Sequence, residues 1–139
     1  MSESLRAFLE GMVKPALQTW REDPLAEHKA KAVVGFVNDL AERYALLSGR
    51  KDTHMVRDEL AAECSDFGLV RDVADGTKHR VVGRQNSRVH GAESTKIEVS
   101  GDSPAIIVTL KDGSKRRLMD AVDASVAMWD AKLSSAGNI

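Results

Sequence analysis

The chain has 139 residues, of which 42 % are hydrophobic and 29 % charged, a size and composition typical of one globular domain and not of a disordered protein. The formal net charge of −1 excludes a general attraction of the whole molecule for nucleic acid or membranes. The single cysteine, Cys64, excludes an intramolecular disulfide, and because no signal peptide or membrane-length apolar run is found, we expect a cytoplasmic protein.

Two helices are predicted in the first 49 residues. Apolar residues at helical spacing indicate a helix over residues 4–20, in which Pro15 predicts a kink or break near Lys14. A longer helix is expected to begin at Asp23, which can cap it, and to end at Gly49. We expect its buried stripe to contain Val33, Phe36, Val37, Leu40 and Tyr44, and its exposed face to contain Lys31, Asn38, Asp39 and Glu42.

Two shorter helices are expected next. Residues 52–64 are predicted to form a helix capped by Asp52, and a fourth helix runs from about Ser65 to His79. Helical geometry divides the fourth helix into an apolar and a polar face. The apolar face holds Leu69, Val70, Val73, Ala74 and Thr77, and the polar face holds Arg71, Asp72, Asp75, Lys78 and His79.

The hydrophobic period changes to that of strands after Val81. Residues 95–101 alternate apolar and charged positions, and residues 104–110 form a continuous apolar run. Asp112 and Gly113 supply a hairpin turn, after which Lys115, Arg116 and Arg117 indicate an edge strand. A last helix, which Asp120 is expected to cap, carries a narrow apolar stripe. The stripe consists of Val122, Val126, Trp129 and Leu133.

These elements predict an α+β fold in a single domain, residues 1–139. It comprises a mainly helical bundle of about four helices (1–79), a small antiparallel β-hairpin or sheet (80–118) and a C-terminal helix (119–135).

Positive charge is concentrated in the middle of the chain. Residues 78–117 contain nine basic and four acidic residues, a net charge of +5, whereas residues 1–77 have a net charge of −4 and residues 118–139 of −2. This asymmetry indicates an anionic partner, either a nucleic acid or an acidic protein. The block has no aromatic residue for stacking on bases. Its candidate binding residues are Lys78, Arg80, Arg84, Arg88, Lys115, Arg116 and Arg117.

The polar face of the fourth helix is the second candidate site. Arg71, Asp75 and His79 follow one another at intervals of four, with Lys78 between the last two. Such a row can present cations to a phosphate or hold a charged histidine. The alternative is a solvent-exposed face stabilised by pairs of opposite charge.

A long helix beginning DPLAEHKAKA (23–32) and a polar helix ending in KH (78–79) resemble the HEPN superfamily of small helical domains, and in particular small bacterial and phage proteins. This resemblance implies a helical bundle and, in the active members, a dimeric ribonuclease. In those members an arginine contacts the scissile phosphate and a histidine, separated from it by roughly four to six residues, moves a proton at the 2′-hydroxyl. Arg71 and His79 would be that pair, although seven residues separate them, and Arg84 and His90 have five between them but lie outside any helix.

Three hypotheses follow. The first is a binding or regulatory module that uses residues 78–117 against an anionic partner, without catalysis. The second is a dimeric, metal-independent HEPN-type ribonuclease of a toxin or defence system, with Arg71 and His79 from different subunits. The third is a structural protein that forms a homodimer through the stripe of the last helix. No cofactor or metal is expected, because the histidines have no zinc-ligand spacing.

Overall fold

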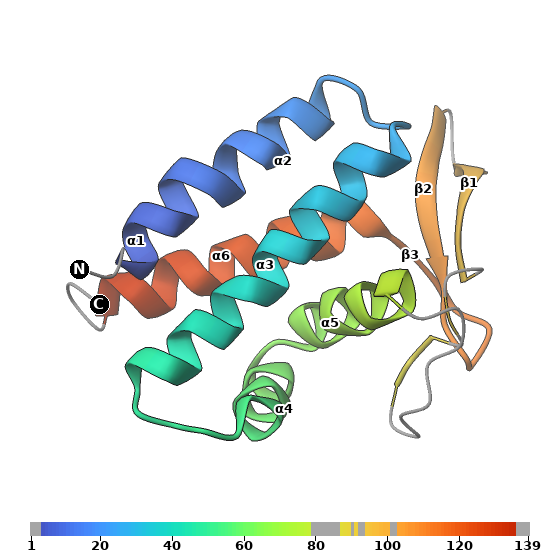
Figure 1. Ribbon diagram of the computed structural model, residues 1–139. Coiled ribbons are helices and arrows are strands. Elements are labelled where there is room, and N and C mark those ends of the chain that lie inside the picture. The colour runs from blue at the N-terminus through green and yellow to red at the C-terminus, as the bar shows by residue number, and fades with distance from the viewer. Residues whose placement is uncertain (1–3, 79–86, 90, 92–93, 101–102, 136–139) are drawn as a thin grey trace.

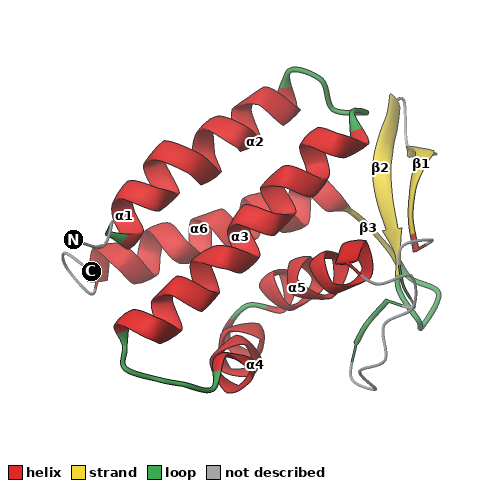
Figure 2. Cartoon of the chain, viewed as in Figure 1, coloured by secondary structure: helices red, strands yellow, loops and turns green. Residues whose placement is uncertain are grey.

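The computed structural model describes residues 4–78, 87–89, 91, 94–100 and 103–135. The chain forms a bundle of helices with a small antiparallel sheet at one end (Figures 1 and 2), which confirms the predicted α+β class. The elements in chain order are α1 (Leu5–Phe8), a π-helical segment (Leu9–Val13), α2 (Lys14–Arg21), α3 (Glu27–Leu47), α4 (Thr53–Glu63), α5 (Ser65–Lys78), β1 (Thr95–Ser100), β2 (Ser103–Thr109), β3 (Lys115–Arg117) and α6 (Leu118–Ser135).

The N-terminal helix continues past Pro15. Ser4 caps it by accepting a hydrogen bond from the amide of Ala7. The wider π-helical segment then precedes α2, and the amide of Lys14 donates to the carbonyl of Leu9, five residues back. Pro15, which has no amide proton, lies in the first turn of α2. A π-helical segment therefore stands where the sequence predicted a kink or break.

The start predicted for the second helix is wrong. Helix α3 begins at Glu27 after Ala26, and Asp23 lies in the preceding turn, where its carboxylate pairs with Lys29 at 3.1 Å. The predicted end is confirmed, because Gly49 follows the helix with a φ of 73°, a conformation that favours glycine.

The burial pattern of α3 differs from the prediction at four positions. Val33, Val37 and Leu40 are buried as predicted, whereas Phe36 and Tyr44 are only half-buried. Of the residues expected on the exposed face, Asn38 is 2 % exposed and Asp39 is half-buried. The polar face is narrower than expected because α3 is covered by α2, α4, α5 and α6.

Helices α4 and α5 begin as the sequence predicts. The carboxylate of Asp52 accepts hydrogen bonds from the amides of His54 and Met55, and α5 starts at Ser65. The expected apolar face of α5 is buried at its described positions. Arg71 and Asp72 are also buried, at 4 % and 5 % exposure. The alternative in which they lie on a solvent-exposed face is therefore wrong for these two residues.

The sheet has the strand order β1-β2-β3, with both pairs antiparallel. The turn between β2 and β3 is as predicted: Gly113 has a φ of 87°, and Asp112 accepts hydrogen bonds from the amide and hydroxyl of Ser114. These bonds hold the pKa of Asp112 below its usual value. Helix α6 begins at Leu118, directly after β3, so that Asp120 lies in its first turn and does not cap it.

One hydrophobic cluster contains residues of the N-terminal helix, α3, α4, α5, β2 and α6. Trp129 lies within it, fully buried, with edge-to-face contacts to Tyr44 and Phe67. The rest of the α6 stripe is at most 8 % exposed. The stripe therefore belongs to the core of one chain and is not available as a homodimer seam. No helix in the described part of the chain is long and apolar enough to cross a membrane.

Candidate functional site

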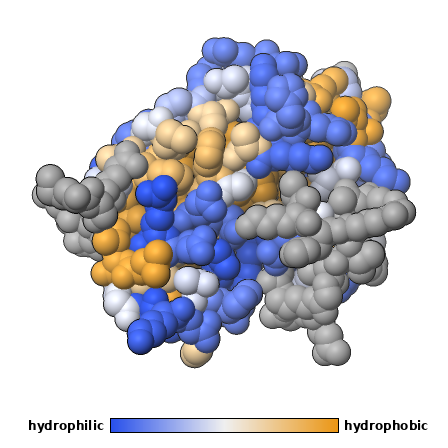
Figure 3. Space-filling view, viewed as in Figure 1, coloured by the Kyte–Doolittle hydropathy of each residue, from blue (hydrophilic) through white to orange (hydrophobic). Residues whose placement is uncertain are grey.

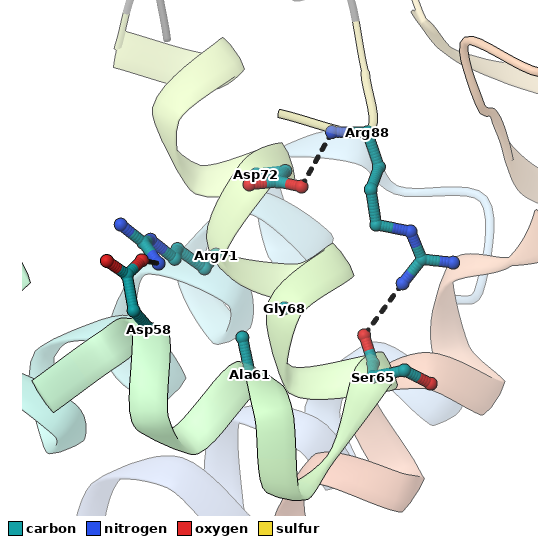
Figure 4. A pocket seen from close by; sticks show the side chains of 7 residues that line it. All are labelled: Asp58, Ala61, Ser65, Gly68, Arg71, Asp72 and Arg88. Atoms are coloured by element: carbon teal, nitrogen blue, oxygen red, sulfur yellow. Dashed lines mark hydrogen bonds and ion pairs between the residues drawn. The ribbon is translucent and has the colours of Figure 1, made fainter. Parts of the chain in front are cut away.

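A cleft of about 570 Å³ lies between α4 and α5, and Arg88 also lines it (Figure 4). Two of its lining residues are arginines and two are aspartates. The lining consists of Asp58, Ala61, Ser65, Gly68, Arg71, Asp72 and Arg88.

Arg71 is held in the wall of the cleft. Its side chain is 5 % exposed, and its Nη1 lies 2.5 Å from Oδ1 of Asp58. Asp58 itself is 54 % exposed and belongs to the neighbouring helix, α4. The buried member of the pair is thus fixed by packing, whereas the exposed carboxylate can rotate into solvent. A guanidinium has five N–H groups, and among the described residues this one donates only to Asp58.

Arg88 reaches the same cleft from outside the helices. Its backbone amide donates to Oδ2 of Asp72 at 2.8 Å, and its Nη1 donates to the carbonyl of Ser65 at 2.8 Å. Asp72 is buried, so its carboxylate anchors the segment 87–89 to the middle of α5. Figure 4 shows the Arg88 side chain extending from this anchor toward the start of α5. Arg71 and Arg88 therefore line one cleft at two separate places, each held by its own partner.

The close approach of α4 and α5 depends on Gly68. A Cβ atom at this position would lie 3.0 Å from the Cβ of Ala61, closer than two carbon atoms normally pack. The small side chains at these two positions let the helices meet at the floor of the cleft, which brings Asp58 and Arg71 within bonding distance.

The basic residues of β3 lie away from the cleft and are paired. Lys115 bonds Glu98 at 2.6 Å across the sheet, and Arg116 forms two hydrogen bonds with Asp66, at 2.9 and 3.1 Å. The bonds with Asp66 raise the pKa of Arg116 above its usual value. Arg117 is half-buried and also has an interaction partner. Much of the positive charge of this strand is thus balanced within the chain.

Of the predicted site residues, Arg71 and Arg88 line the same cleft. Asp75 lies one turn beyond Arg71, half-buried, and does not line the cleft, and Lys78 is the last residue of α5. His79, Arg80, Arg84 and His90 lie outside the described residues. Sequence reasoning missed Asp58 and the anchoring role of Asp72, because both depend on contacts between segments that the sequence keeps apart.

The chain was compared with models of protein families, with curated proteins and with solved structures. None of them matches it. The chemistry of the cleft is accordingly argued from its own residues. Among the described residues no three histidine, cysteine or acidic side chains gather as metal ligands, whereas the two arginines offer donors suited to planar anions.

Proposed function

We propose that this chain is a HEPN-like binding module that recognises an acidic segment of a protein partner, with one carboxylate of that segment at Arg71 and another at Arg88. The observation that carries the proposal is that two arginines from different segments line one cleft, Arg71 beside Asp58 and Arg88 beside Ser65 (Figure 4). The proposed setting is the cytoplasm of a bacterium or of a phage-infected cell.

The pair formed by Arg71 and Asp58 indicates the kind of group that the cleft accepts. Asp58 is a carboxylate bound to a buried arginine, yet it is itself exposed. Water competes for the exposed carboxylate of Asp58, whereas the buried guanidinium of Arg71 needs an anion beside it. A carboxylate of the ligand can therefore replace Asp58 at Arg71, which is already held in place and loses little conformational freedom on binding.

The charges around the cleft favour an acidic protein over a nucleic acid. Asp58 and Asp72 alternate with the two arginines of the lining, so that the cleft lacks the run of positive charge that a nucleic-acid backbone needs, whereas a single carboxylate needs only one guanidinium. Lys115 and Arg116 are bonded to acidic residues of the chain itself. Residues 78–117 also contain no aromatic side chain on which bases could stack.

The ribonuclease hypothesis requires a histidine beside Arg71. Its candidate, His79, lies outside the described residues, and Arg71 is bonded to Asp58. In that hypothesis the histidine belongs to a second subunit, whereas the arginines of this cleft suffice to bind an anion, so binding is the function that we propose.

The test is a fluorescence anisotropy titration with a labelled peptide of alternating Glu and Gly residues. Arg71→Gln should weaken binding about tenfold or more, because a hydrogen bond to a charged group is worth about 1.5–3 kcal/mol. Asp58→Asn should strengthen binding about two- to fivefold, because it removes the competing carboxylate. Lys31→Gln, an equal charge change on an exposed residue of α3, should leave the affinity unchanged.

A single-stranded RNA oligonucleotide serves as the second probe. RNA binding that is tighter than peptide binding and is lost in Arg88→Gln would replace the acidic protein with a nucleic acid as partner. RNA cleavage that is abolished by His79→Ala would establish the ribonuclease instead. Tighter peptide binding by Asp58→Asn distinguishes the proposal from an effect on folding, because a damaged fold would not raise the affinity.

A further inference from the structure

Strand β1 carries exposed apolar side chains at the end of the sheet. Ile97 is 45 % exposed and Val99 is 77 % exposed. In the register with β2 they oppose Ile106 and Pro104, on the side where β2 packs against the core. Figure 1 places β2 between the helices and β1, and Figure 3 shows apolar surface at the upper right, over the end that the sheet occupies. The helices thus cover this side of the sheet at β2 and leave it open at β1.

The outer edge of β1 is available for a further strand. Among the described residues, β1 is hydrogen-bonded to β2 alone, so its other edge presents backbone N–H and C=O groups without a strand partner. An edge of this kind is a template for pairing with another chain. The alternation of charged and apolar residues along TKIEVS then decides which chain fits.

We propose that a second copy of this chain pairs with β1 in antiparallel orientation, with the two-fold axis at Ile97. In this register Lys96 of each copy lies opposite Glu98 of the other. Opposite charges that face each other across two paired strands stabilise the pairing. Ile97 meets its own counterpart, and Thr95 meets Val99. The β1 strand is therefore complementary to itself.

The neighbouring registers do not share this complementarity. A two-fold axis perpendicular to the sheet leaves the core-facing sides of both copies on the same side of the joined sheet. With such an axis one residue lies opposite its own counterpart, so the neighbouring registers are centred on Glu98 or on Lys96. A centre at Glu98 places the two Glu98 carboxylates opposite each other, and a centre at Lys96 does the same with two ammonium groups. Both arrangements are destabilising. Glu98 also keeps its bond with Lys115, because Lys115 uses Oε1 and leaves Oε2 for Lys96 of the second copy.

The pairing joins two three-stranded sheets into one six-stranded sheet, with both helical bundles on the same side. Ile97 and Val99 of both copies then form the floor between the bundles. This interface lies on β1, whereas the cleft is lined by α4, α5 and Arg88, so the dimer can be tested independently of the proposed anion binding.

The first experiment measures the association of the full chain by sedimentation, over about 1 µM to 1 mM, the range of modest affinities. The wild-type chain should dimerise, and Lys96→Glu should weaken the dimer at least tenfold, because it places like charges opposite each other twice. Adding Glu98→Lys to this variant exchanges the charges and should restore most of the affinity. Lys111→Glu, the same change on the exposed β2–β3 turn, should have no effect.

The second experiment tests the register through cysteine cross-linking under mild oxidation, in a Cys64→Ala background. Ile97→Cys should form a disulfide-linked dimer, because its counterpart lies directly opposite. Val99→Cys should not, because the two copies of residue 99 are four residues apart along the strands, about 13 Å. Residue 99 is the more exposed of the two, so random collisions would favour it. A monomer at all concentrations, or cross-linking that favours Val99→Cys, would overturn the proposal.

Discussion

Arg71 and Asn38 are both polar residues buried among helices, and their surroundings differ. Arg71 has an ion-pair partner in Asp58 and opens onto a cleft, so its burial positions a charge. Asn38, by contrast, has a buried Oδ1 atom without a hydrogen-bond partner in the part of the chain that the structure describes. A buried acceptor left unbonded costs about 1–3 kcal/mol. The two positions should therefore respond in opposite ways to an apolar substitution.

We expect Asn38→Leu to stabilise the protein by about 1 kcal/mol, because leucine has a similar shape and removes the unbonded oxygen. The melting temperature should rise by about 3–5 °C, measured by circular dichroism. Asn38→Asp should lower it, since a buried carboxylate is harder to desolvate than an amide. A less stable Asn38→Leu variant would show that the amide has a bonding role in the core.

At the scale of elements, the contact between α4 and α5 shows what the sequence could predict and what it could not. Apolar periodicity and the Asp52 cap predicted both helices closely, because these signals are local. The burial of Arg71 and Asp72 could not be predicted from periodicity, since it results from α4 and from residues 87–89 packing over that face. The cleft likewise depends on Asp58 and Arg88, which lie 30 residues apart in sequence.

The same contact gives a prediction for Gly68. Gly68→Ala should destabilise the protein by about 1 kcal/mol: the crowding of Ala61 costs about 1–3 kcal/mol, and the better helix propensity of alanine returns about 0.5–1 kcal/mol. In an Ala61→Gly background the crowding is absent, so the same substitution should be stabilising. Urea denaturation of the four variants measures this change of sign. Equal effects in both backgrounds would show that the helices move apart freely.

At the scale of the whole molecule, the first and last helices are joined by a group of charges. Asp130 of α6 accepts hydrogen bonds from Arg6 at 2.8 Å and Lys14 at 3.0 Å, and Lys14 also bonds Glu10 at 2.8 Å. The bond with Lys14 is the main cause that holds the pKa of Glu10 below its usual value. Burial alone would raise the pKa of Asp130, but its bonds with Lys14 and Arg6 outweigh this and lower it.

These shifts predict how stability depends on pH. A carboxyl group whose pKa is lower in the folded state contributes stability above its unfolded pKa, here 4.5 for Glu10 and 3.8 for Asp130, and this contribution is lost as the pH falls through the folded values. Lys14→Met should therefore reduce stability at neutral pH, by less than about 1 kcal/mol since the pairs are largely exposed. The difference from wild type should shrink below pH 4.5. If the difference in stability between Lys14→Met and the wild type does not change with pH, the effect comes from packing and not from the ion pairs.

The bonds from Arg6 to Asp130 and Ser134 also bring the beginning and the end of the fold together. They meet at the end of the bundle away from the sheet (Figure 1). A short peptide linker can therefore connect Ser135 to Ser4, while the chain is opened at the exposed turn around Gly49. Such a circular permutant would keep the contacts between the helices and would change only the order in which the helices are synthesised. This architecture thus allows the order of the helices along the chain to be changed while the folded structure stays the same.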